Sequence, residues 1–408
     1  MEAVAQTHMS TVVDGLLTTL NDLAPEIARY SKQLDSERRL PAPLFEAMAD
    51  AGLFRIWLPK TLDGAQLSIR DFLPVIEEAS RLDGSIGWNM TVGVASSLLA
   101  GYMPDTAAAD IFSAPRAYVG GQFNPTGTAI PVAGGYRVTG RWAYGSGVHN
   151  ASGVFGNFVI QQDGTASDGP PRIRAGVFEP SQVEIIDNWH VSGLRGTGSC
   201  DFAVKDVFVP TERTVDAFAP IPSGMGARKS MALITLLPVT IAAVALGIAR
   251  AAIDALLAIA DKRTPTGTTV LLRDRETVQA DVARAEALLR SSRAFLVERL
   301  DEYIDQLWEP AETTRDVPIR NRALYRLACT QVGENAVRVV DSMAGLGGRA
   351  RTSKALRWNA ACATSMRWRN TLPSPPETMS SRGGCSLAYH RAHRGFEPGR
   401  MYRRCRVG

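Results

Sequence analysis

The stretch GGYRVTGRWAYGSG, residues 134–147, is the part of the sequence from which the fold is first recognised. β-Prone residues lie on both sides of the glycine pair Gly134-Gly135, which predicts two antiparallel strands joined by a two-residue turn. Further short runs of β-branched and aromatic residues, separated by Gly, Pro, Asp and Ser, continue to Pro210. We therefore expect a β domain over residues 116–215, with strands at 128–133, 136–142, 154–161, 172–178, 183–189 and 201–209.

The same stretch carries three residues that suit the binding of a planar ligand. Trp142 offers a flat aromatic wall, Ser146 a hydroxyl, and Gly147 a backbone that a ligand can approach closely. A core tryptophan followed by an ordinary Ser-Gly turn fits the same letters, so the residue types alone leave both interpretations open. Downstream, the glycine-rich turn at 194–199 presents the guanidinium of Arg195, either as a fixed charge in a site or as a solvated side chain.

Helical patterns surround the β domain on both sides. In residues 1–115, apolar side chains recur every three or four positions, with Pro41 at one expected helix start and Asp71 as the expected cap of another. Residues 225–348 return to the same period. Residues 230–248 within them are uncharged, and we expect a helix buried inside a bundle rather than a membrane span. The order of helices, sheet and helices predicts an α+β fold.

Composition and charge exclude several classes of protein. The 408 residues are 45% hydrophobic, which is too apolar for a disordered chain, and the five cysteines form neither a disulfide framework nor a zinc cluster. Residues 349–408 hold 13 basic and 2 acidic residues, whereas residues 1–348 hold 32 and 39. A mildly acidic body gives no case for nucleic-acid binding, and no signal peptide is visible. We expect a cytoplasmic protein without a nucleic-acid or membrane partner.

Five strings in a fixed order resemble the acyl-CoA dehydrogenase superfamily. They are RRLPAPLFEAMADAGLFRIWLP (38–59), EEASRLDGSIGW (77–88), GGYRVTGRWAYGSG (134–147), GLRGTGSCDFAVKDVFVP (193–210) and DSMAGLGG (341–348). The GRWxxxSG and LRGTGS forms are more similar to the flavin-dependent monooxygenase branch, the oxygenase components of two-component hydroxylases. The resemblance implies an N-terminal helical domain (1–115), a central β-barrel domain (116–215) and a C-terminal four-helix bundle (225–348), assembled as a homotetramer.

The resemblance also implies roles for individual residues. Trp142, Ser146 and Gly147 would hold the isoalloxazine ring of FAD or FMN, and Arg195 would be a catalytic group that stabilises negative charge developing on oxygen. Gly347, in a glycine-rich helix end, would approach the flavin of a neighbouring subunit, although a helix C-cap accounts for these glycines equally well. Arg263 and Gln279 resemble residues that reach the pyrophosphate across the subunit interface, with a longer spacing than in dehydrogenases.

Two enzymatic activities and one non-enzymatic role are compatible with this resemblance. Oxidation of an acyl-CoA thioester requires a carboxylate base, and the chain has neither a YEGT-type loop nor an acid around Leu236–Leu237. We therefore expect a monooxygenase that hydroxylates a small aromatic or polycyclic substrate with O2. No nicotinamide motif is present, so reduced flavin would come from a separate reductase. Ser96 stands where that branch often has a histidine, and His149 lies one position before another such histidine. These departures leave two alternatives: an acyl-CoA dehydrogenase with an unrecognised base, and a catalytically impaired flavin-binding paralogue.

Residues 349–408 differ from the rest of the chain in composition. They contain three of the five cysteines and strings rich in Ser, Pro and Arg. Reading 355–396 with a two-base offset and permitted synonymous codons gives an amphipathic peptide that contains HVHA and is followed by a stop. We hypothesise that the coding frame shifts near residues 348–351, that the chain is impaired by it, and that the tail is irregular. A divergent basic tail that binds an acidic partner is the alternative.

Overall fold

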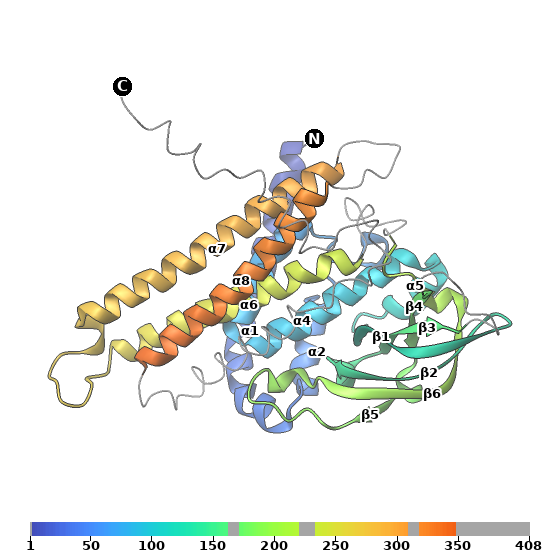
Figure 1. The fold of residues 1–408 in the computed structure, drawn as a ribbon, viewed down its shortest axis with the longest axis horizontal. Coiled ribbons are helices and arrows are strands. Elements are labelled where there is room, and N and C mark those ends of the chain that lie inside the picture. Colours follow the sequence, from blue (N-terminus) through green and yellow to red (C-terminus); the bar gives the residue numbers. More distant parts are fainter. Residues whose placement is uncertain (1, 162–170, 220–232, 309–317, 348–408) are drawn as a thin grey trace.

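The computed structural model describes residues 2–161, 171–219, 233–308 and 318–347. Helices, one sheet and then long helices follow each other along the chain, as expected (Figure 1). The N-terminal helices lie between the sheet on one side and the long C-terminal helices on the other. This arrangement brings the ends of several strands against helices, and the candidate site lies at that junction.

Five α-helices make up the N-terminal part: α1 (Glu2–Glu37), α2 (Ala42–Asp50), α3 (Ile69–Leu82), α4 (Gly84–Ser96) and α5 (Asp105–Phe112). α2 begins directly after Pro41, as predicted. The predicted cap of α3 is wrong, because Ser68 is the N-cap and its side chain accepts a hydrogen bond from the backbone N–H of Asp71. α4 is capped by Asp83 and continues into a 3-10 helix, Ser97–Tyr102.

Seven strands form one mixed sheet in the order β5-β6-β2-β1-β3-β4-β7. They are β1 (Val119–Val132), β2 (Gly135–Gly145), β3 (Gly153–Ile160), β4 (Ile173–Phe178), β5 (Glu184–Ile186), β6 (Cys200–Pro210) and β7 (Thr214–Val215). Among the strand pairs of the described residues, only β1–β3 is parallel. In the predicted hairpin Val132 lies opposite Gly135, so the turn residues are Ala133 and Gly134. β5 and β7 end the order, so the central domain is an open sheet over the described residues rather than a closed barrel.

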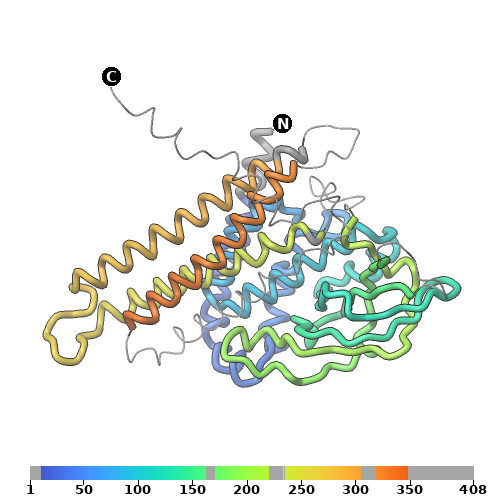
Figure 2. The backbone as a smooth tube through the Cα atoms, in the orientation of Figure 1, coloured from blue at the N-terminus to red at the C-terminus, as the bar shows by residue number. Residues whose placement is uncertain are grey.

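Three long helices follow the sheet: α6 (Leu233–Ala260), α7 (Glu276–Trp308) and α8 (Ile319–Leu346). α8 lies between α6 and α7 (Figure 2). α6 is apolar and long enough to cross a membrane, yet 83% of its most apolar window is buried inside the protein, as in a core helix. The described residues thus contain three helices of the expected four-helix bundle. The tail that the sequence predicts to be irregular, 349–408, lies outside the described residues.

Two hydrophobic cores stabilise these parts. The larger core joins the N-terminal helices to α6, α7 and α8. The smaller core lies in the central domain, among side chains of β1, β2, β3, β4 and β6. Each large apolar side chain buried there contributes about 1.5–3 kcal/mol. The sheet and the helices are therefore rigid supports for the residues between them.

Candidate functional site

The candidate site lies where β1 and β2 stop pairing regularly. Their ladder covers Thr128–Val132 and Gly135–Thr139, and the register of β1 on β3 shifts between Gln122 and Gly127. Beyond the end of the β1–β2 ladder, the side chain of Gln122 donates a hydrogen bond to the carbonyl oxygen of Ala143 at 2.9 Å. Strand irregularities of this kind are common beside active sites, because they re-aim side chains.

Tyr144 follows Ala143 on β2. Its φ is 64°, in the left-handed region that a residue with a Cβ rarely occupies. Its side chain is 55% exposed, and its ring packs edge-on against Trp189 with the centroids 6.2 Å apart. A strained backbone that exposes an aromatic ring next to irregular strands indicates a functional position.

A series of buried hydrogen bonds begins at Trp88 and passes through Ser146. The indole Nε1–H of Trp88, on α4, donates to Ser146 Oγ at 2.9 Å. The hydroxyls of Ser146 and Ser199 lie 2.7 Å apart, as do those of Ser199 and Thr197. Thr197 in turn donates to the carbonyl oxygen of Leu194 at 2.8 Å. The series links α4, the end of β2 and the glycine-rich turn before β6.

Trp142 lies in the core of the sheet and not at an open surface. Its ring is fully buried, stacks on Phe202 at 5.0 Å and 13°, and donates through Nε1 to the carbonyl oxygen of Asn157 at 2.7 Å. A Cβ added at Gly127 or Gly156 would come within 2.4 or 2.6 Å of the ring. With its faces covered by protein, Trp142 supports the sheet. Its ring does not form the exposed wall of a ligand site that the sequence suggested.

Gly147 and Arg195 also make contacts within the protein. Gly147 has a φ of 76°, and a Cβ there would lie 2.2 Å from the hydroxyl of Tyr118, so the close approach is to a tyrosine. Arg195 donates from Nε to the carbonyl oxygen of Asp35 at 2.7 Å and from one terminal nitrogen to that of Val191 at 2.9 Å. Because Asp35 lies in the last turn of α1, the guanidinium also complements the helix dipole. The structure thus places Arg195 as an anchor between α1 and the turn, in contrast to the predicted catalytic role.

The other three predicted residues lie together at the far end of the helical bundle. Arg263 donates to the carbonyl oxygen of Gly347. Gln279, in the first turn of α7, donates to the carbonyl oxygen of Arg273 in the connection between α6 and α7, at 3.0 Å. This end of the bundle points away from the sheet (Figure 1). The predicted approach of these three residues to the flavin of a neighbouring subunit stays a prediction.

His149 and Cys200 form a second polar cluster beside the turn. His149 Nε2 lies 3.4 Å from Cys200 Sγ, and Asp187 nearby is held by two hydrogen bonds from Arg38, 2.6 and 2.7 Å long. Burial, followed by the charge of Arg39, lowers the pKa of His149, and burial raises the pKa of Cys200. A protonated thiol beside a neutral imidazole is not an activated nucleophile.

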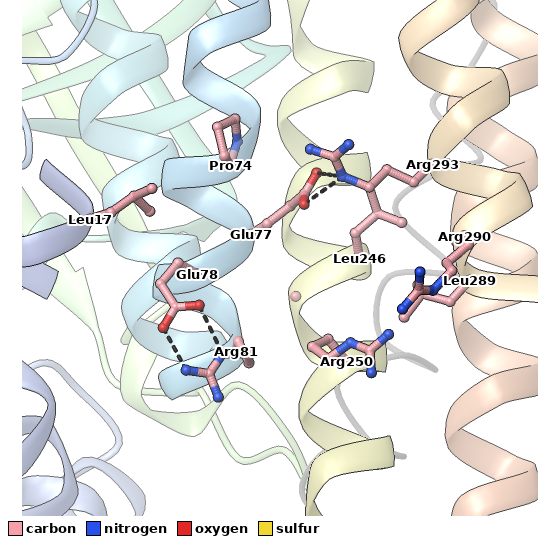
Figure 3. Close-up of a pocket in the computed structure, with 11 residues that line it drawn as sticks. Leu17, Pro74, Glu77, Glu78, Arg81, Leu246, Arg250, Leu289, Arg290 and Arg293 are labelled. Carbon is pink, nitrogen blue, oxygen red and sulfur yellow. Dashed lines mark hydrogen bonds and ion pairs between the residues drawn. The ribbon is translucent and has the colours of Figure 1, made fainter. Parts of the chain in front are cut away.

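A cleft of about 320 Å³ lies between α1, α3, α6 and α7 (Figure 3). Across it, Arg293 Nε donates to both carboxylate oxygens of Glu77, at 2.8 and 3.0 Å. Other ion pairs around it are Glu78–Arg81, Arg81–Asp254, Arg250–Asp254, Arg250–Glu286 and Arg290–Glu286. Because cations and carboxylates pair with each other, the cleft is better explained as a joint between the helical parts than as a ligand site.

Trp88, Tyr144 and Ser199 are the residues that sequence reasoning missed. They lie inside the quoted strings, but nothing local indicates that Trp88 reaches a serine 58 positions away. Together with Ser146 they fit the flavin that the resemblance implies. Ser146 accepts one hydrogen bond within the described residues and therefore has one lone pair left for a ring edge. Tyr144, two positions earlier in the sequence, has an exposed ring.

Two family models match the chain. "Acyl-CoA dehydrogenase, N-terminal domain" matches residues 18–107, and "Acyl-CoA dehydrogenase, C-terminal domain" matches residues 239–356. The indole-3-acetate monooxygenase of Pseudomonas putida is 33% identical over 326 residues, which cover 78% of this chain and 79% of that protein. The oxygenase component of the FADH(2)-dependent resorcinol hydroxylase of a Rhizobium species is 29% identical over 307 residues, 72% and 73% of the two chains.

A solved structure agrees with these matches at the level of the fold. XiaF from Streptomyces sp., in complex with FADH2 and glycerol, superposes with a TM-score of 0.82 at 21% identity and covers 97% of this chain and 98% of its own. With both ends of the chain matched by the family models and a monooxygenase related over most of its length, the chain belongs to the acyl-CoA dehydrogenase superfamily, in the branch of flavin-dependent monooxygenases.

Proposed function

We propose that the chain is the oxygenase component of a two-component hydroxylase that acts on a small aromatic or polycyclic substrate. Reduced FAD or FMN, delivered by a separate reductase, would supply the electrons that activate O2. The observation that carries this proposal is the length over which relatives match, because proteins named for the oxidation of indole-3-acetate and the hydroxylation of resorcinol align with more than 70% of the chain.

The chain's own residues would bind and shield the ring. Ser146 would accept a hydrogen bond at the ring edge, and the exposed ring of Tyr144 would cover one side of the ligand. Trp88, Ser199 and Thr197 are buried and hold Ser146 in place without contact to water. Trp142 would act indirectly, by keeping the end of β2 rigid.

The position of the single carboxylate of α6 argues against the dehydrogenase alternative. Asp254 is the only acid between Leu233 and Ala260, and it pairs with Arg81 and Arg250. The half of α6 around Leu236–Leu237 has no group that could abstract a proton next to a thioester.

We also propose that the chain is a homo-oligomer, with a tetramer as the expected state. The end of the helical bundle that carries Arg263, Gln279 and Gly347 points away from the sheet, so we expect these residues to approach a flavin beside Ser146 only from another subunit. Exposed apolar side chains on the helical bundle suit such a contact; they are Leu257, Val270, Ile319 and Leu327. Light scattering should give a mass of several chains, and a single-chain mass would contradict the proposal.

The test of the activity mixes the protein with anaerobically reduced flavin, a panel of phenols, indoles and polycyclic ketones, and ¹⁸O2. We expect a hydroxylated product that contains one ¹⁸O atom, and none from reduced flavin without protein. Bleaching of bound oxidised FAD by an acyl-CoA would instead support the dehydrogenase. If neither reaction occurs although flavin binds, the chain is a non-catalytic paralogue.

A further inference from the structure

The buried hydrogen bonds from Trp88 to Leu194 can run in only one direction. An indole N–H is a donor without a lone pair to offer, and a backbone carbonyl is an acceptor without a proton. The two ends of this series of hydrogen bonds therefore fix the direction in which every bond is donated. The carbonyl end is firmly set, since the oxygen of Leu194 also accepts from Trp189 Nε1 at 3.2 Å.

Each hydroxyl between these ends has a single proton, so the donors can be assigned in turn. Thr197 donates its proton to the carbonyl oxygen of Leu194. Ser199 must then donate to Thr197, and its proton is used. Ser146 must therefore donate to Ser199, while it accepts from Trp88.

This assignment restricts what Ser146 can do for a ligand. With its only proton held by Ser199, it can accept one more hydrogen bond but cannot donate one. Thr197 and Ser199 are at most 2% exposed, so bulk water does not compete for the hydrogen bond between their hydroxyls or turn it around. The arrangement is a fixed acceptor at the end of β2.

We propose that Thr197 and Ser199 are positioning residues that make Ser146 select reduced over oxidised flavin. This inference rests on the proposed function, in which Ser146 meets the ring edge. The central-ring nitrogen N5 of oxidised flavin is an acceptor, and in reduced flavin it carries a hydrogen and donates. An acceptor at Ser146 therefore matches the reduced form and meets the oxidised form with two opposed lone pairs.

The experiment compares the dissociation constants of oxidised and reduced flavin in the full-length protein and its variants. Oxidised flavin is titrated by fluorescence quenching in air, and reduced flavin anaerobically by calorimetry. In Thr197→Val and Ser199→Ala the proton of Ser146 loses its fixed direction, so Ser146 becomes able to donate to oxidised flavin. The preference for reduced flavin should fall by about tenfold, the effect of one hydrogen bond.

A control variant separates the direction of the protons from a general disturbance of the fold. Ser292→Ala removes a buried hydroxyl of α7 that bonds the carbonyl of Leu288 and the side chain of Asn335, and should change neither constant.

The outcomes distinguish this inference from the proposed function. If the wild type prefers reduced flavin and hydroxylates a substrate, but Thr197→Val and Ser199→Ala keep its preference, the inference is wrong and the proposed function stands. If the wild type binds neither form of flavin, the proposed function fails and the inference with it. A loss of preference in Thr197→Val and Ser199→Ala, with folding confirmed by circular dichroism, supports both.

Discussion

At the scale of single residues, Gly147 fixes the geometry of the candidate site through its backbone. Its φ of 76° is unfavourable for any residue with a Cβ, and the methyl group of alanine would lie 2.2 Å from the hydroxyl of Tyr118. That hydroxyl donates to the carbonyl oxygen of Asn89 at 3.1 Å, so it cannot move freely. We expect Gly147→Ala to lower the free energy of unfolding by about 2–4 kcal/mol and to weaken flavin binding.

Gly134→Ala is the matched control for that substitution. Gly134 has a similar φ of 79°, but nothing lies within 4 Å of the Cβ that alanine would add. It should therefore show the backbone cost alone, about 1–2 kcal/mol, and leave flavin affinity unchanged. Equal losses of stability in the two variants, measured by urea unfolding, would show that the contact with Tyr118 is unimportant.

His149 predicts a dependence of stability on pH. Burial, with smaller effects of Arg39 and Arg38, lowers the pKa of His149 below 6.5 in the folded chain, and Asp187 opposes this only in part. As the pH falls below the unfolded value of about 6.5, the unfolded chain therefore takes up a proton that the folded chain does not. The stability contributed by the neutral imidazole is present above that pH and is lost as the pH falls towards the folded pKa.

His149→Gln tests this prediction because glutamine does not titrate. Between about pH 7 and pH 5, the urea midpoint of the wild type should fall more steeply than that of the variant. Parallel pH profiles would show that another group causes the loss of stability.

At the scale of elements, the ion pair between Glu77 and Arg293 joins α3 to α7 across the cleft of Figure 3. Burial raises the pKa of Glu77 and outweighs the opposing effect of Arg293. Without Arg293 the carboxylate would remain buried and unpaired. We expect Arg293→Met to lower the free energy of unfolding by about 1–3 kcal/mol, less than for a fully buried pair because Arg293 is 44% exposed.

The pH dependence of that loss identifies its cause. For a carboxyl whose pKa is raised on folding, the stability contributed by the neutral form is present at low pH and is lost as the pH rises through the folded pKa. The cost of Arg293→Met should therefore be larger at pH 8 than at pH 5. Arg290→Met is the control, since Glu286 keeps its bond to Arg250 and little change is expected. A cost of Arg293→Met that does not vary with pH would point to lost packing instead.

At the scale of the whole molecule, the sequence predicts elements better than it predicts contacts. The period of apolar residues is a local property. It predicts helices over residues 276–307 and 320–343, and the structure has α7 at Glu276–Trp308 and α8 at Ile319–Leu346. The letters around Trp142 do not distinguish a core ring from the wall of a ligand site, because that difference depends on Phe202, a distant residue that stacks on it. The bond between Trp88 and Ser146 could not be predicted for the same reason.

The end of the chain carries the last prediction, because a shift of reading frame near residue 348 would change what completes the bundle. Restoring one or two bases there should replace the basic tail by an amphipathic ending with histidines that can support proton transfer. Each large apolar side chain that it buries against α6 and α8 should add about 1.5–3 kcal/mol of stability. A chain that stops after Gly348 is the control that separates gain of the new ending from loss of the old one. The restored chain should unfold at higher urea concentration and hydroxylate faster than both other forms. If sequencing finds no open frame with an early stop, or if the restored chain matches the 408-residue chain in solubility, flavin binding and activity, the frame has not shifted in a way that matters to function.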